Sequence, residues 1–222
     1  MLRRFHARSY VNESRDERYR GHADRALHKK IEEGTHTWSG IHQMNIFYLH
    51  KKQSKCARWH CDKHVVKMIL ETTQLLYTAH WMLCIDVGKL PNFSTAPPMK
   101  GEPRMRGYLP ISNANHPCAI WTRASVEHYR WLVILGMALC NEFRVRFTGK
   151  AHSCEAHLRW LYFNEPTGFA KTTWTEPPLA MAEEYRCSKS AIVSYRNYYK
   201  KGKTHLLTYT GRHKPQWLLD RA

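Results

Sequence analysis

The sequence predicts a mainly α, compact single-domain helical fold whose helices are joined by long loops rich in proline and glycine. Apolar residues recur at three- and four-residue intervals in two long stretches, which is the pattern of amphipathic helices. No long run of strict alternation demands a large sheet. Hydrophobic residues fill 43% of the 222 positions and aromatic residues 12%, which is enough material for a buried core.

Residues 1–43 differ in composition from the rest of the chain. They contain nine Lys and Arg and six Asp and Glu, with few clustered apolar residues and no lasting period. We expect a flexible N-terminal extension here. At Met44 the run Met-Asn-Ile-Phe-Tyr-Leu begins, and we expect it to be the first packed element of a helical domain over 44–222.

The apolar spacing predicts a first helix over 56–83 and a second over 117–147. Between them, residues 86–115 are interrupted by many prolines and glycines, which predicts a long loop. The second helix should begin at Pro117 with Asn115 or His116 as its cap, and Gly136 is a candidate for close helix packing. Further helices are expected over 151–163, 179–186 and 188–200.

The charge of the chain predicts a polyanionic partner. The chain carries 35 Lys and Arg against 18 Asp and Glu, a formal charge of +17, and Lys and Arg gain affinity by displacing phosphate counterions. Seven scattered cysteines without a paired framework favour a reducing compartment. No apolar stretch approaches the roughly 18 residues of a membrane span. We therefore expect a cytoplasmic protein that binds nucleic acid and no membrane.

Residues 185–219 concentrate this charge, with eight Lys and Arg and no Asp or Glu. Tyrosines interleave with the cations, a combination that suits stacking on exposed bases and binding of phosphates. Tyr195 and Tyr199 have the spacing of a core pair. We expect nucleic-acid contacts from Arg196, Tyr198, Lys200 and Lys201.

One face of the first predicted helix carries a polar stripe of His60, His64, Lys67, Glu71, Gln74 and Thr78. Two interpretations stay open: the stripe faces water, or its apolar flanks partly enclose it and shift its pKa values. The spacing of His60 and His64 would also let both imidazoles reach one metal ion, with Cys56 or Cys61 adding a thiolate. The pattern lacks a second zinc cluster, so we expect no metal and no other cofactor.

A second constellation surrounds the start of the helix at Pro117. Asn115 and His116 precede the free backbone amides of a helix start, where an anion such as phosphate is stabilised. An ordinary helix cap is the alternative, and Trp121 is expected in the core. We expect His64, Asn115, His116 and Arg123 to contact nucleic acid.

Several of these residues together resemble a known family. They are the run 62–67, then Glu71 and residues 74–76, then 115–117 with Trp121, and finally residues 138–143. In these motifs the chain is similar to the phage and bacterial pyrimidine-dimer DNA glycosylases of the endonuclease V type, over roughly residues 44–147. The resemblance implies a compact helical fold, a phage- or virus-encoded protein, and binding to duplex DNA. It also implies a DNA glycosylase and AP lyase in which an amine forms a Schiff base while a carboxylate assists.

The resemblance does not identify the group that supplies the amine. An α-amino group with a pKa of about 8 is partly neutral at pH 7, whereas an ordinary lysine at about 10.4 is not. Because 43 residues precede Met44, either a chain terminus near Asn45 arises by internal initiation or processing, or Lys67 or Lys63 supplies the amine. Glu71 is the predicted carboxylate, and Asp62 is either a second catalytic acid or a helix cap.

Two other functions are compatible with the same residues. The first is a non-catalytic nucleic-acid-binding protein on the same fold. The second is a metal-dependent nuclease or transferase that uses His60, His64 and Cys61.

Overall fold

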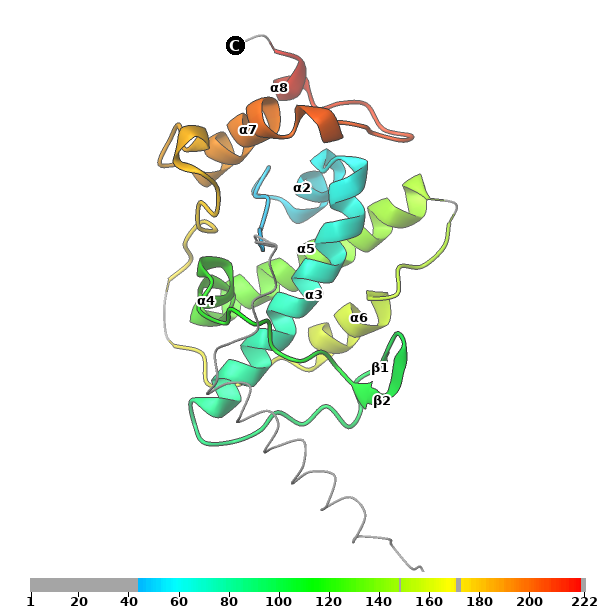
Figure 1. Cartoon of the computed structure of the whole chain (residues 1–222), viewed down its shortest axis with the longest axis vertical. Helices are drawn as coiled ribbons and strands as arrows, with labels where there is room; N and C mark the ends of the chain where they lie inside the picture. Colours follow the sequence, from blue (N-terminus) through cyan, green and yellow to red (C-terminus); the bar gives the residue numbers. More distant parts are fainter. Residues whose placement is uncertain (1–43, 148, 171–172, 221–222) are drawn as a thin grey trace, which may run out of the picture. The chain divides into compact units, whose positions relative to one another are not determined.

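The computed structural model describes residues 44–147, 149–170 and 173–220, all within the second of the two units into which the chain divides, Gln43–Ala222. The predicted extension over 1–43 lies outside the described residues. The fold is mainly helical, as expected (Figure 1). Its elements are α2 (Gln53–Trp59), α3 (Asp62–Ile85), β1 (Pro98–Met99), β2 (Glu102–Arg106), α4 (Pro117–Ala124), α5 (Val126–Arg146), α6 (Glu155–Phe163), η1 (Glu183–Tyr185), α7 (Ala191–Gly202), η2 (Thr204–Leu206) and α8 (Gln216–Leu219).

Two long helices, α3 and α5, pack against each other and form the centre of the fold. Helices α2, α4 and α6 pack around this pair, while α7 and α8 lie together beyond α2 (Figure 1). The packing is close at Gly136 of α5, where an added Cβ would stand 2.7 Å from Leu158 Cδ2 and 2.9 Å from Thr72 Cγ2. Close packing at Gly136, predicted from the sequence, is thus confirmed.

The prediction of one continuous helix over 56–83 is wrong, because the chain forms two helices, α2 and α3, that are separated at His60 and Cys61. Both residues adopt extended backbone angles, with ψ of 138° and 162°. The His60 carbonyl accepts from Arg146 Nη1 at 2.8 Å, and the Asp62 amide donates to Thr208 O at 2.9 Å. These long-range bonds replace helical ones, so tertiary structure overrides the local apolar period.

The second predicted helix, over 117–147, is also two helices. Ser125 separates them in an extended conformation, and its hydroxyl accepts from the His128 amide at 3.2 Å, which caps α5. His116, one of the two predicted caps, is the cap of α4. A serine before a charged turn is an ordinary start signal, and the continuous apolar spacing concealed it.

The remaining boundaries differ more. Helix α6 begins at Glu155 rather than 151, and α7 spans Ala191–Gly202 rather than 188–200. The helix expected over 179–186 is wrong, since only the short η1 forms there. The backbone of Ala180, within this stretch, makes long-range hydrogen bonds instead of helical ones. Its amide donates to the Tyr195 hydroxyl, and its carbonyl accepts from Asn45. The predicted loop over 86–115 is confirmed, with a small antiparallel hairpin of β1 and β2 inside it.

Residues 45–49 form a buried segment without regular secondary structure that connects the C-terminal helices to the core. Arg196 of α7 donates from Nε to Leu49 O at 3.1 Å, and Phe47 packs against Tyr195, Tyr198 and Tyr199 of α7. None of the helices in the described ranges is both long and apolar enough to cross a membrane.

Candidate functional site

Glu71 is the centre of the site, and it projects from the middle of α3 with only 7% of its side chain exposed. Its Oε1 lies 3.1 Å from Lys67 Nζ, one turn earlier on the same helix. Its Oε2 accepts a hydrogen bond of 3.1 Å from the backbone N–H of Asn45. The Lys67 side chain is 51% exposed, so the carboxylate lies between a buried backbone group and an amine that solvent and ligands can reach.

The Asn45 side chain is held from two directions. Its Nδ2 donates to Ala180 O at 2.7 Å, and its Oδ1 lies 2.7 Å from the hydroxyl of Tyr195 in α7. Beside it, the Cys118 thiol contacts Met44 O at 3.9 Å, and burial, together with the nearby Glu71 charge, raises the pKa of Cys118 to about 12. The site therefore unites residues 44–45, α3, α4, α7 and the loop before η1.

The polar stripe divides between core and surface, so the interpretation that it simply faces water is wrong. His64, Glu71 and Thr78 are buried, whereas Lys67 is exposed. His64 stacks on Phe47 with ring centroids 4.2 Å apart, and its Nδ1 lies 2.6 Å from the Tyr199 hydroxyl. Burial lowers the pKa of His64 to about 2, so the imidazole is neutral at pH 7. The structure thus makes this histidine a core residue rather than the expected nucleic-acid contact.

His60 is fully buried at the α2–α3 junction, and so it is not on the helix that carries the stripe. Its Nδ1 bonds to Cys56 O at 2.8 Å, while its Nε2 has no hydrogen-bond partner among the described residues. Burial lowers the pKa of His60 to about 4. Within the described residues, no three His, Cys, Asp or Glu side chains gather as a metal site would require.

Asp62 belongs to a buried ion network and not to the Glu71 site, which is about two and a half helical turns away. Cys61, not Asp62, occupies the cap position of α3. Asp62 Oδ1 lies 3.1 Å from Nη1 of the fully buried Arg146, and the Thr210 amide and hydroxyl donate to the same carboxylate. Arg146 also pairs with Glu142, which a second arginine, Arg212, holds at 3.0 Å.

The start of α4 forms an ordinary cap, as one of the two interpretations of that constellation predicts. His116 Nδ1 accepts from the Cys118 amide at 3.2 Å, and the His116 carbonyl accepts from the Ala119 and Ile120 amides. The first-turn amides are therefore used within the chain, which argues against a phosphate site on them. Asn115 is exposed.

Two neighbours of this cap hold the surrounding loops in place. Arg123 donates from Nη1 to Ala114 O, so its guanidinium fixes the loop before α4. Trp121 is buried, as predicted, and its Nε1 donates to Thr175 O at 3.1 Å. The expected nucleic-acid contact through Arg123 therefore competes with a structural bond.

The tyrosines of α7 are not the stacking surface that we expected. Tyr195, Tyr198 and Tyr199 are all buried, and Tyr198 packs on Tyr185 with centroids 4.6 Å apart. Arg196 is partly buried between Trp59, at 4.8 Å, and Trp217, at 5.4 Å. These contacts anchor α8 and α2 to α7, and they explain why aromatic and cationic residues interleave in this stretch.

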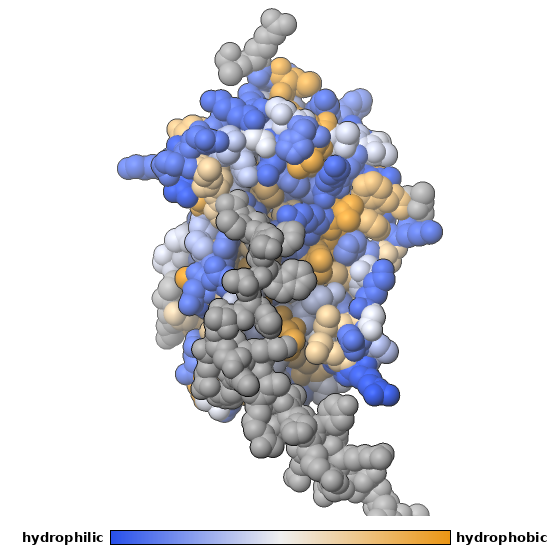
Figure 2. All heavy atoms as spheres, viewed as in Figure 1, coloured by the Kyte–Doolittle hydropathy of each residue, from blue (hydrophilic) through white to orange (hydrophobic). Residues whose placement is uncertain are grey.

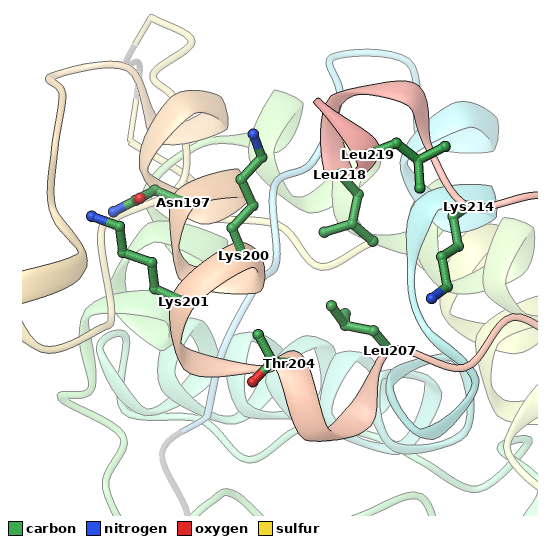
Figure 3. Close-up of a pocket in the computed structure, with 8 residues that line it drawn as sticks. All are labelled: Asn197, Lys200, Lys201, Thr204, Leu207, Lys214, Leu218 and Leu219. Carbon is green, nitrogen blue, oxygen red and sulfur yellow. The ribbon is translucent and has the colours of Figure 1, made fainter. Parts of the chain in front are cut away.

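Lys200 and Lys201 do lie on the outer side of α7, where Lys214 joins them around a pocket of about 370 Å³ between α7, η2 and α8 (Figure 3). Leucines 207, 218 and 219 with Asn197 and Thr204 complete the lining, which contains no acidic side chain. Figure 3 shows the lysine chains spread around the rim rather than converging on one point. Lys214 belongs to the basic stretch 185–219 but was not among the specific contacts that we expected, because only the fold brings it to α7.

Hydrophilic side chains also gather on the visible surface of this end of the molecule (Figure 2). Lys63 of α3 is exposed one turn before Lys67, so both predicted lysines lie on the accessible face of α3.

No protein family model, no curated protein and no solved structure matches the chain.

Proposed function

We propose that the protein acts on DNA as a glycosylase and AP lyase, with Lys67 as the amine and Glu71 as the assisting carboxylate. The observation that carries the proposal is the 3.1 Å contact between Lys67 Nζ and Glu71 Oε1. Only one member of this pair is buried, so the amine is accessible while its base is held in place by Asn45. A base within hydrogen-bond reach of its amine is the arrangement that activated nucleophiles require.

The proposed reaction uses the Lys67–Glu71 pair in the following order. Glu71 takes a proton from the Lys67 ammonium, and the neutral amine attacks C1′ of the deoxyribose. At a damaged nucleotide the new N–C1′ bond forms as the bond to the base breaks, and the base leaves with the bonding electrons and takes up a proton. The C1′–O4′ bond then opens, with a proton passing to O4′, which gives an iminium ion. At an abasic aldehyde the amine adds to C1′, and the resulting carbinolamine loses water to give the same ion. In the resulting iminium ion, loss of a C2′ proton breaks the C3′–O bond and releases the phosphate-bearing strand. Glu71 is placed to return or remove protons in these steps.

The amide nitrogen of Asn45 is not itself a nucleophile in the full chain, because it is acylated by Met44. In a chain that begins at Asn45, an α-amine would replace this amide beside Glu71 Oε2. The mass of the natural protein's amino terminus tests this alternative, which would transfer the role of Lys67 to the terminus.

The partner that we propose is duplex DNA, bound through the basic surface around Lys200, Lys201 and Lys214. Lysine ammonium groups spread around a rim suit a run of phosphates better than a single small anion, and the lining lacks carboxylates that would repel phosphate. The exposed Lys63 adds positive charge next to the Lys67 amine.

Borohydride trapping tests the proposal. The full chain is incubated with a duplex that contains one abasic site, reduced, digested and mapped by mass spectrometry. We expect a covalent adduct on Lys67, and we expect Lys67→Ala and Glu71→Gln to abolish it. Lys63→Ala is the matched control, since it removes an exposed lysine one turn away and should retain trapping. An adduct on Lys63 would refute the assignment of the amine.

A non-catalytic DNA-binding protein is the second candidate. The Lys67–Glu71 pair has the i, i+4 spacing of pairs that simply stabilise helices, which favours this alternative. The absence of an adduct with abasic or damaged duplexes, combined with DNA affinity that Glu71→Gln leaves intact, would establish it over the enzyme.

A further inference from the structure

We infer that Tyr195 is a positioning residue of the Glu71 site, and that it acts through Asn45. The inference rests on the proposed function, because positioning matters only if Glu71 and Lys67 perform chemistry. Tyr195 contacts neither of these side chains in the described bonds; its hydroxyl lies 2.7 Å from Asn45 Oδ1, and the Asn45 backbone N–H reaches Glu71.

The orientation of the Asn45 side chain is fixed by its partners. The Ala180 carbonyl can only accept, so the amide group that faces it at 2.7 Å must be Nδ2. Oδ1 then faces the Tyr195 hydroxyl, whose single hydrogen lies between two acceptors at 2.7 Å, Asn45 Oδ1 and Pro178 O. The same hydroxyl accepts from the Ala180 amide at 3.3 Å. The Tyr195 hydroxyl thus makes hydrogen bonds both to the loop at residues 178–180 and to Asn45.

The buried surroundings make this hydroxyl a dependable donor. Tyr195 is fully buried, and burial raises its pKa well above the ordinary value, so the phenol carries its proton at neutral pH. By holding the Asn45 side chain, the phenol also fixes the adjacent backbone N–H, which in turn occupies Glu71 Oε2. The other carboxylate oxygen, Oε1, is then directed to the Lys67 amine.

Tyr199, one turn further along α7, provides a matched control. It is also fully buried, and its hydroxyl also makes a buried side-chain bond, but to His64 Nδ1 rather than to Asn45. A Tyr→Phe change at either position removes one buried hydroxyl from the same helix. Only the change at Tyr195 removes a hydrogen bond from the Asn45 side chain.

The experiment measures single-turnover cleavage of an abasic-site duplex and the Kd for the same DNA, using the full chain. We expect Tyr195→Phe to lower the rate constant about tenfold with Kd unchanged within twofold, because a small displacement of a reacting group is costly. Tyr199→Phe should change neither value by more than twofold. In an Asn45→Ala background, which removes the side chain that Tyr195 holds, Tyr195→Phe should cause no further loss of rate.

The outcomes separate the inference from the proposed function. If the wild-type chain cleaves DNA and Tyr195→Phe cleaves at the wild-type rate, or if the effects of Tyr195→Phe and Asn45→Ala multiply, the positioning role is refuted while the proposed enzyme stands. Equal losses in Tyr195→Phe and Tyr199→Phe would likewise assign the effect to general destabilisation and refute the inference. A wild-type chain without cleavage or trapping refutes both.

Discussion

Arg146→Met should destabilise the protein strongly, because the guanidinium is the centre of the buried ion network. It donates to Asp62 Oδ1 at 3.1 Å, Glu142 Oε2 at 3.2 Å, and the His60 and Arg58 carbonyls, both at 2.8 Å. Methionine keeps most of the apolar volume and removes every donor. The two carboxylates and two carbonyls then remain in a site from which water is largely excluded.

The expected loss in the free energy of unfolding depends on the hydrogen bonds that Asp62 and Glu142 keep after the substitution. Removing one partner of a buried ion pair costs about 3–5 kcal/mol, because the other charge is left buried. In this network Thr210 still donates to Asp62, and Arg212 still holds Glu142. We therefore expect the lower end, about 3 kcal/mol in the free energy of unfolding. For a domain of this size, that loss corresponds to a fall in Tm of about 6–12 °C.

Urea and thermal unfolding, followed by circular dichroism at pH 7, measure the change. Arg130→Met is the matched control, because Arg130 makes a two-bond pair with Glu165 at 2.7 and 2.9 Å but is exposed. Solvent screens and replaces such a pair, so the control should lose far less stability. If Arg146→Met is no less stable than Arg130→Met, the network does not hold the helix junction as we argue.

Three further predictions concern packing, pH and charge. Gly136→Ala should lower stability by about 1–3 kcal/mol through overpacking, whereas alanine at an open helical site would raise it; a gain in urea unfolding would contradict the close contact. Stability should fall as pH drops below about 6.5, because burial depresses the folded pKa values of His60, His64 and His80 and the unfolded chain therefore binds more protons, each costing about 1.4 kcal/mol per pH unit. The loss should continue to about pH 4 for His60 and His80 and below that pH for His64. His80→Gln should flatten this slope in unfolding titrations, and an unchanged slope would show that the histidine is not buried neutral. Replacing the three pocket lysines by alanine should reduce the slope of log K against log salt for DNA binding by about 2–3. The control replaces the exposed loop lysines Lys89, Lys100 and Lys150 by alanine. An equal effect in the control would show that only net charge matters.

The fold class was predictable because two amphipathic stretches dominate the sequence, but the helix ends were not. His60 and Cys61 lie within the predicted helical pattern, and the bonds from Arg146 and to Thr208 accompany the break of the helix at these residues. Those partners lie far along the chain, so no local pattern reports them. Ser125 is the opposite case, since its capping role is written locally and was masked by the stronger apolar signal.

The candidate site was predictable where its residues share one helix and not where distant parts of the chain supply its contacts. The spacing of Lys67 and Glu71 on one helix face correctly placed them together. Tyr195 was expected only as a core residue, because its bond to Asn45 joins positions that are 150 residues apart. Conversely, Arg196 and Tyr198 matched the pattern of nucleic-acid contacts, but the aromatic rings that enclose them are supplied by α2, η1 and α8.

The bonds that close the fold have a consequence for how the protein is made. Asn45 meets Tyr195, and Asp62 meets Thr210, across 150 and 148 residues of chain. Contacts of such high sequence separation form late and slow the folding of a helical domain. A nascent chain that has exposed α2 to α6 still lacks the groups that fix Asn45 and cover the α2–α3 junction. The Glu71 site is therefore complete only after translation has reached the C-terminal helices, and we expect shortened products of synthesis to lack the contacts that hold Asn45 against Glu71.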